Sequence, residues 1–318
     1  MTNLGTESQL YTIACTTYCG QRVFKNTRRL IGVIGRRKEL EMMTSILLSG
    51  KHILLEGAPG TSKSTLLRYV TTSLELPLFH VEGSADLTPS KLIGLFNPSL
   101  VLKQGFKSEF FEKGPLLLAM EEGGVLYIDE FNRASPDATN TLIRAMEENE
   151  IVVPRFGTIK AEKNFRVVAA MNPFDDTGVS RLSRALFDRL CRIKMDYQPT
   201  DAEREIVLTA LGDAPSPLVE IGVRIGRATR FDDRLRQGSS VRGAVDFVKI
   251  AENLASIRGE FTTNVIIESA NAAFSGKIWI ENPMNTAEEI LLEIVEAVLR
   301  TMDSNLLDEL SNTLKKRP

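Results

Sequence analysis

The chain has 318 residues, of which 43% are hydrophobic and 25% charged, an ordinary composition for a globular protein with room for two domains. Its formal net charge of −2 gives no reason to expect nucleic acid or another polyanion as a partner. Three cysteines are too few for a disulfide framework or a zinc site with four ligands, so we expect a reducing, cytoplasmic setting.

The N-terminal segment contains no continuous apolar stretch, and the sequence therefore predicts no signal peptide. No later stretch reaches the run of about 18 apolar residues that a membrane-spanning helix needs, so we expect no membrane span. Residues 1–30 are expected to form an N-terminal extension, and their pattern does not indicate its role.

Apolar runs of strand length alternate with amphipathic segments along the first two thirds of the chain. After Gly35 the apolar spacing predicts a helix that ends near Gly50. A short strand at 53–55 then leads into a glycine-rich loop and a helix at 64–74. Further strands are expected at 78–81, 125–128 and 165–170, further helices at 116–122 and 138–149, and a hairpin at 151–159. This alternation predicts an α/β fold with a parallel sheet.

The composition changes near Gln198–Asp201. From Thr200 onward the pattern is helical, apart from a strand-like stretch at 277–280. We therefore expect one α/β domain over 31–199 and a smaller, all-helical domain over 200–318. Thr200 and Glu203 have the spacing of a capping box, in which each side chain bonds the backbone N–H of the other residue.

The loop after the first predicted strand, Gly57–Ser64, reads GAPGTSKS. The Walker A consensus is Gly, four residues, then Gly-Lys-Ser/Thr, because glycines let backbone N–H groups curl around phosphate oxygens. Ser62 stands in place of the second glycine. Lys63 is expected to reach the β- and γ-phosphates of ATP, and the Ser64 hydroxyl to bind Mg²⁺. A Gly-Pro turn with a solvated lysine is the alternative. The predicted phosphate-loop contacts are Gly57, Pro59, Gly60, Thr61, Ser62, Lys63, Ser64 and Thr65.

Two predicted strands end in polar residues that suit phosphate chemistry. Asp129 and Glu130 follow a buried strand, where open α/β sheets bind their ligands. Asp129 would hold the metal, and Glu130 would polarise a water for attack on the γ-phosphate. Asn172 follows the next strand and could orient that water. The alternatives are an acidic pair that caps a helix and a strand-ending Asn-Pro turn.

Four motifs in this order and spacing resemble the MoxR family of AAA+ ATPases. They are Gly57–Ser64, Ile128–Ala134 (IDEFNRA), Ala145–Glu148 (AMEE) and Ala170–Pro173 (AMNP). A small residue in place of the second Walker A glycine is usual in that family, and the resemblance runs from about residue 31 to beyond residue 242. It implies an AAA+ P-loop αβα sandwich with a parallel sheet, followed by a smaller all-helical lid domain.

The resemblance also assigns roles to single residues. Asn172 would be the sensor 1 residue, and Val33 and Ile34 would touch the adenine. Family members carry an insert in their second helix and a hairpin before sensor 1, and here Asp86–Phe111 and Glu150–Asn164 occupy those places. Both would face the pore or the axial surface of a ring. The candidates for contact with a client protein are Phe96, Phe106, Arg155, Phe156 and Lys160.

Two arginines are assigned catalytic roles by the same resemblance. Arg189 matches the arginine finger, which acts on ATP held by the neighbouring subunit, and Arg184 competes for that role. A salt-bridged surface arginine is the alternative for either residue. Arg242 would be the sensor 2 residue that contacts the γ-phosphate. It stands at the start of a predicted helix whose N-cap is Ser239 or Ser240.

The implied function is Mg²⁺-dependent ATP hydrolysis by a homo-oligomer, expected to be a hexameric ring, that remodels or matures a client protein. The closest branch is CoxD-like. It implies metal-cofactor insertion into a molybdenum hydroxylase, beside a partner with a von Willebrand factor A domain. A DNA-directed AAA+ motor is an alternative, against which the near-neutral charge argues. A nucleotide-switched binding module that hydrolyses slowly is another, against which the presence of Glu130 and Arg189 argues.

Overall fold

The structure is a computed structural model and describes residues 33–173, 184–212, 214–282, 284–302 and 310. The predicted extension 1–30 lies outside the described residues. The chain folds into two compact units. Of the described residues, the first unit holds 33–55, 63–171 and 184–193, and the second holds 56–62, 172–173 and those from 194 onward. Within the described ranges, no helix is both long and apolar enough to cross a membrane.

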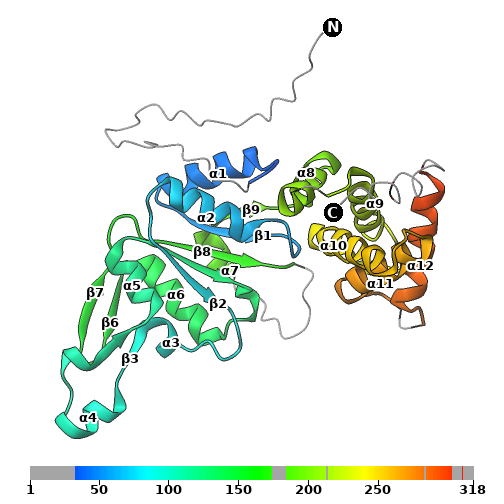
Figure 1. The fold of residues 1–318 in the computed structure, drawn as a ribbon. Coiled ribbons are helices and arrows are strands. Elements are labelled where there is room, and N and C mark those ends of the chain that lie inside the picture. The colour runs from blue at the N-terminus through cyan, green and yellow to red at the C-terminus, as the bar shows by residue number, and fades with distance from the viewer. Residues whose placement is uncertain (1–32, 174–183, 213, 283, 303–309, 311–318) are drawn as a thin grey trace. The chain divides into compact units, whose positions relative to one another are not determined.

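A five-stranded sheet forms the centre of the first unit, in the order β2-β5-β8-β1-β9 (Figure 1). β5 runs parallel to β2 on one side and to β8 on the other, as the alternation of strands and helices predicts. β8 lies between β1, which leads into the phosphate loop, and β5, which ends at Asp129. The strands are β1 His52–Glu56, β2 Leu78–Glu82, β5 Val125–Asp129, β8 Arg166–Met171 and β9 Leu190–Lys194.

Helices cover both faces of this sheet and complete the predicted αβα sandwich. α5 and α6 pack on one face, where Leu117 and Leu142 join Leu126 and Ile128 of β5 in one buried cluster. α1 and α2 lie on the other side of the sheet (Figure 1). The helices of this unit are α1 Arg37–Leu48, α2 Lys63–Ser73, α3 Pro89–Ile93, α4 Pro98–Gln104, α5 Pro115–Glu122, α6 Pro136–Glu148 and α7 Arg184–Arg189.

Two small antiparallel pairs extend the first unit. β3 (Gly94–Phe96) pairs with β4 (Phe111–Lys113), and α4 lies in the connection between them. β6 (Glu150–Val153) pairs with β7 (Gly157–Lys160), which confirms the hairpin predicted at 151–159. The second unit has its own two-stranded pair, β10 (Leu235–Gln237) with β11 (Trp279–Ile280).

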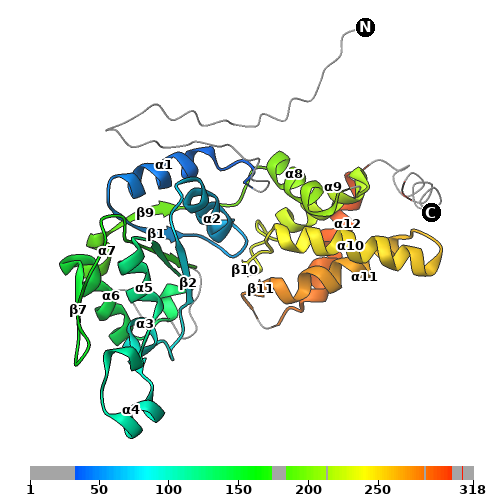
Figure 2. The ribbon, with the colours of Figure 1, turned by 60° about the vertical axis from the view of Figure 1, so that its left-hand side comes forward.

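Helices make up most of the described part of the second unit (Figure 2). They pack around an apolar core that includes Phe247 and Phe274, both fully buried. The strand-like stretch at 277–280 is confirmed as β11, whereas its partner β10 is not predicted. β10 reads Leu-Arg-Gln and has no apolar run that would mark it as a strand. The helices are α8 Thr200–Leu211, α9 Ser216–Ala228, α10 Val241–Arg258, α11 Thr263–Phe274 and α12 Ala287–Arg300.

The capping box predicted at Thr200 and Glu203 is wrong. The N-cap is Pro199, no side chain caps α8, and Thr200 already lies in the first helical turn. The Glu203 carboxylate is instead buried against arginines of the same unit. The prediction of a serine cap on α10 is confirmed at Ser240, whose hydroxyl oxygen accepts the N–H of Arg242 at 3.3 Å.

Candidate functional site

The phosphate loop joins the end of β1 to the start of α2 at Lys63, so Lys63, Ser64 and Thr65 form the first turn of that helix. Backbone N–H groups at such a helix start favour anions. Gly60 and Ser62 have φ angles of +73° and +68°. Position 62 therefore requires the left-handed conformation that glycine adopts most easily, and here a serine adopts it.

Internal contacts fix the shape of this loop. The Thr61 hydroxyl is buried and donates to the Ala58 carbonyl oxygen at 2.9 Å. A Cβ atom on Gly57 would lie 2.3 Å from the carbonyl oxygen of Met195, so only glycine fits there. Residues of alternating backbone sign closed by an internal hydrogen bond form a concave nest, a shape that suits a phosphate group.

The acidic pair Asp129–Glu130 lies at the end of β5 in a kinked backbone. Glu130 has φ +47°, and its N–H donates to the Asp129 carboxylate at 3.0 Å. The Glu130 carboxylate pairs with Arg133 at 2.9 Å and is 42% exposed, so water reaches it. A left-handed non-glycine residue directly after a buried strand is the kind of backbone strain that collects at functional sites.

Gly83 is a residue of this region that the sequence analysis does not single out. Its N–H donates to the Asp129 carbonyl oxygen at 2.7 Å. A Cβ atom on Gly83 would lie 2.4 Å from the carbonyl oxygen of Glu130. A glycine is thus needed for the chain after β2 to approach the kink. The only available signal is its place directly after a strand that pairs with β5.

Tyr127 lies on the same face of β5 as Asp129, two residues earlier. Its ring stacks on His80 of β2, with centroids 5.2 Å apart. Burial, and then the negative charge of Asp129, raise the pKa of the Tyr127 hydroxyl above its usual value. This hydroxyl is buried beside the Asp129 carboxylate. A carboxylate at the end of a buried strand is a ligand type that Mg²⁺ prefers, so Asp129 fits a magnesium site.

The two candidate arginine fingers differ in their surroundings. Arg189, in the last turn of α7, pairs with Glu147 of α6 and donates to the carbonyl oxygen of Ala185. Arg184, the first residue of α7, is exposed. Arg189 is therefore held by its own chain, and this contact fixes where its guanidinium is presented.

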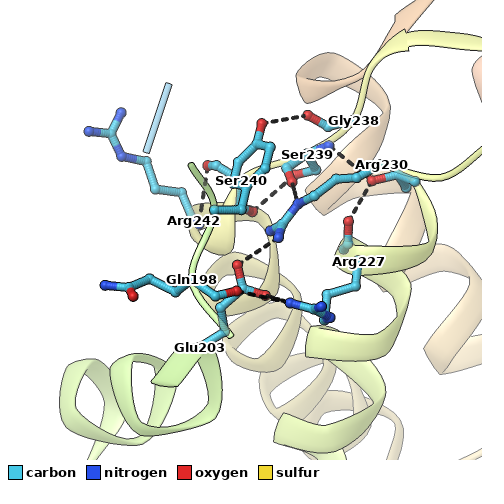
Figure 3. Close-up of polar contacts among 11 residues, drawn as sticks. Gln198, Glu203, Arg227, Arg230, Gly238, Ser239, Ser240 and Arg242 are labelled. Atoms are coloured by element: carbon cyan, nitrogen blue, oxygen red, sulfur yellow. Dashed lines mark hydrogen bonds and ion pairs between the residues drawn. The ribbon is translucent and has the colours of Figure 1, made fainter. Parts of the chain in front are cut away.

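The remaining predicted residues lie as follows. Val33 and Ile34 lie shortly before α1, separated from it by Gly35 and Arg36, and are both half-buried. Asn172 directly follows β8. Arg242 is exposed in the first turn of α10, and Figure 3 shows its side chain extending away from the buried polar groups beside it. The first unit holds Val33, Ile34, Lys63, Ser64, Thr65, Asp129, Glu130 and Arg189, and the second holds residues 57–62, Asn172 and Arg242.

A pocket of about 370 Å³ borders the phosphate loop within the second unit. Gly57 and Ala58 form one side of it. A pocket of this volume is in the range that holds small molecules. Its lining consists of Glu56, Gly57, Ala58, Pro173, Lys194, Met195, Asp196, Tyr197, Gln198, Arg227, Arg230 and Phe231.

The chain is similar to several known proteins. Residues 52–190 match the family described as AAA domain (dynein-related subfamily). An uncharacterised protein of Staphylococcus epidermidis is 30% identical over 237 residues, covering 73% of this chain and 86% of that protein. The gas vesicle ATPase GvpN1 of Halobacterium salinarum is 29% identical over 212 residues, covering 62% of this chain and 60% of GvpN1. The RuvB Holliday junction branch migration motor of Thermotoga maritima has a TM-score of 0.50 at 18% identity, covering 75% of this chain and 70% of RuvB.

The parallel sheet, the bent phosphate loop and the acidic end of a buried strand define the class as a P-loop ATPase. Residues 52–190 form an AAA domain of the dynein-related subfamily, and the chain is an ATPase. The alignment with GvpN1 spans only 60% of that protein's length, and the likeness to RuvB shows a shared fold.

Proposed function

We propose that the chain is a Mg²⁺-dependent ATPase of the MoxR type that assembles into a hexameric ring and remodels or matures a client protein. The phosphate nest at Gly60 and Ser62 would hold the phosphates, with Lys63 near the β- and γ-groups. Ser64 and Asp129 would hold Mg²⁺, which offsets phosphate charge when bound. Val33 and Ile34 would contact the adenine.

In the proposed reaction, Glu130 polarises a water for attack on the γ-phosphate, and Asn172 orients that water. Its exposure and its kinked backbone support this role for Glu130. Arg189 of a neighbouring copy would offset the charge that spreads over the phosphoryl oxygens, and Arg184 is the alternative. Arg242 would contact the γ-phosphate.

The observation that carries the client part of this proposal is an aromatic cluster that joins the insert to the hairpin. Phe96 of β3 contacts Phe111 of β4 at 5.0 Å between centroids, and Phe111 stacks on Phe156 of the hairpin at 4.4 Å. Phe106 packs against Phe96 at 5.1 Å, and Arg155 lies over the Phe106 ring at 3.9 Å. The two loops thus form one body.

Exposed apolar side chains on this body support contact with another protein. Leu102 of α4 is 87% exposed and Phe106 is 50% exposed. α4 lies at the end of a projection from the first unit in Figures 1 and 2. We propose that Leu102 and Phe106, with Arg155 over the Phe106 ring and Lys160 elsewhere in the hairpin, contact the client. A cytoplasmic molybdenum hydroxylase, acting with a von Willebrand factor A-domain partner, is the client class we favour.

A role with gas vesicles is a second candidate, and the similarity to GvpN1 over 62% of this chain favours it. The near-neutral net charge argues against a DNA-directed motor, so we rank this function below the other two candidates.

The test is a pull-down with the Glu130→Gln variant in ATP, followed by identification of the proteins that remain bound. A client should be retained by Glu130→Gln and lost from Glu130→Gln combined with Leu102→Ser and Phe106→Ser. Leu292→Ser, on the exposed side of α12, is the matched control and should keep the client. Recovery of this chain alone would contradict the remodelling proposal. DNA binding that weakens steeply with salt would favour the motor instead.

A further inference from the structure

A buried carboxylate lies at the start of α8 with two arginines around it. The Glu203 side chain is only 3% exposed, and Arg230 donates to it at 2.6 Å. Arg227 lies 3.4 Å from its other oxygen and also donates to the carbonyl oxygen of Gln198 at 3.0 Å. A buried carboxylate is stable in its charged form only when it is paired in this way. Figure 3 shows these groups converging between α8, α9 and the segment that begins α10.

Arg230 is the member of this group that reaches the start of α10. Its Nε donates to the carbonyl oxygen of Ser239 at 2.7 Å while its terminal nitrogen holds Glu203. The flat face of its guanidinium lies over the Tyr197 ring, 3.9 Å from the ring centroid. Its side chain is 7% exposed. Two directed hydrogen bonds and one stacked face use the planar fork of an arginine, which lysine does not have.

The neighbouring backbone is held from the same side. The Ser239 N–H donates to the Thr229 hydroxyl oxygen at 2.9 Å, and that hydroxyl donates to the Gly226 carbonyl oxygen at 2.7 Å. A Cβ atom on Gly238 would lie 2.6 Å from the Arg230 backbone. Both polar groups of the Ser239 backbone are therefore bound by residues at or just after the end of α9. Ser240 then caps α10, and Arg242 follows two residues later.

The same residues also meet the phosphate loop. Arg230 and Tyr197 line the pocket that Gly57 and Ala58 border. A Cβ atom on Gly60 would lie 2.5 Å from the Cβ of Ser240, so the loop and the cap are in close contact. All of these residues fall in the second unit. A molecule in this pocket would touch Arg230, which is bonded to the segment that presents Arg242.

We infer that Arg230 is a positioning residue that links occupancy of the phosphate-loop pocket to the placement of Arg242. Glu203 and Tyr197 hold the guanidinium, and the guanidinium holds the Ser239 carbonyl. This inference rests on the proposed role of Arg242 as the residue that distinguishes ATP from ADP. A buried ion pair contributes little to the stability of a fold, because desolvation of the two charges offsets their attraction. Its role here is to fix the orientation of the Arg230 guanidinium.

The test measures the affinities of the full-length protein for ADP and for a non-hydrolysable ATP analogue by calorimetry, with Mg²⁺ present. Arg242→Ala should lower the ratio of analogue affinity to ADP affinity about fivefold or more, and Arg230→Lys should lower it similarly. The double variant should be no worse than either single variant, because both act through one contact. Arg224→Lys, which alters an ion pair with Glu220 elsewhere on α9, is the matched control and should leave the ratio unchanged.

Thermal unfolding of each variant shows whether the variant is folded, so that a changed affinity ratio is not caused by loss of the fold. If Arg230→Lys does not fold, Thr229→Val provides the same test, because it removes the hydroxyl that binds the Ser239 N–H and keeps the side-chain shape. An unchanged ratio in folded Arg230→Lys, or effects that add in the double variant, would overturn the inference while the role of Arg242 stands. An Arg242→Ala variant with an unchanged ratio would overturn both.

Discussion

The acidic end of β5 and the start of α10 are built in different ways. At the end of β5 the backbone does the positioning, through the left-handed Glu130 and the close approach of Gly83. At the start of α10 a network of buried side chains holds the backbone, with Arg230 at its centre. Where backbone geometry positions a residue, one added carbon atom is enough to displace that residue. Where side chains hold the backbone, the position depends on a charge and on the planar set of donors of an arginine.

Substitution of Arg189, the partner of Glu147, tests whether the first unit depends on a side chain as well as on backbone geometry for ATP hydrolysis. Arg189→Ala should lower kcat about 10³-fold in the assembled protein, the effect of removing an arginine finger. Arg184→Ala should change kcat less than about threefold. Mixing Arg189→Ala with Glu130→Gln chains should restore part of the turnover, because each supplies the group that the other lacks. A large loss in Arg184→Ala with normal turnover in Arg189→Ala would assign the finger to Arg184.

Gly83→Ala tests the backbone side of the comparison. Its new Cβ atom would meet the Glu130 carbonyl oxygen at 2.4 Å, so the kink and the carboxylate must shift. We expect kcat to fall about 10²-fold with little change in nucleotide affinity, because a displacement near 1 Å at a reacting group has that cost. Steady-state kinetics and calorimetry measure the two quantities. Gly276→Ala, where a Cβ atom meets nothing within 4 Å, should behave as the parent protein, and equal behaviour of both variants would refute the role of Gly83.

His52 of β1 makes the stability of the sheet depend on pH. Its Nδ1 accepts the N–H of Val167 at 2.9 Å, and burial, then the nearby charge of Arg166, lower its pKa from 6.5 to about 4. The unfolded chain therefore binds more protons between these values, and stability is lost as the pH falls from 6.5 toward 4. We expect the free energy of unfolding to fall about 2 kcal/mol between pH 7 and pH 5 from this group. Urea titrations at pH 7 and pH 5 measure the free energy of unfolding of the parent protein and of His52→Gln, whose amide cannot gain this charge. The fall between the two pH values should be about 2 kcal/mol larger in the parent protein, and an equal fall in both proteins would exclude this role for His52.

Ser62→Gly gives the smallest expected effect and sharpens the backbone argument. Serine at φ +68° carries a left-handed strain that glycine does not, although glycine costs more entropy on folding. The net gain in the free energy of unfolding should be about 0.5 kcal/mol, measured without nucleotide. Ser62→Ala should show no gain, because alanine keeps the strained backbone. A loss of stability in Ser62→Gly would mean that the serine side chain stabilises the loop more than its backbone strains it.

The sequence predicts those features that are local in the chain. The strand, loop and helix around Gly57–Ser64 and the serine cap on α10 can each be read from a few adjacent residues, and the structure has them there. Gly83 was not predicted, because its importance depends on pairing between β2 and β5. The spacing at Thr200 and Glu203 indicated a capping box, but a buried pairing with Arg230, 27 residues later, determines where the Glu203 carboxylate lies. The network around Arg230 joins four separate segments, and no local pattern marks it.

Arg189 is paired with Glu147 within its own chain. In the proposed ring, the Arg189 guanidinium acts instead on ATP held by a neighbouring copy, so a dilute, unassembled chain would lack this group at its own site. The proposal therefore predicts that turnover per chain rises with protein concentration until the ring is saturated, and then becomes constant. A cell could set the rate of this ATPase through the number of copies it makes.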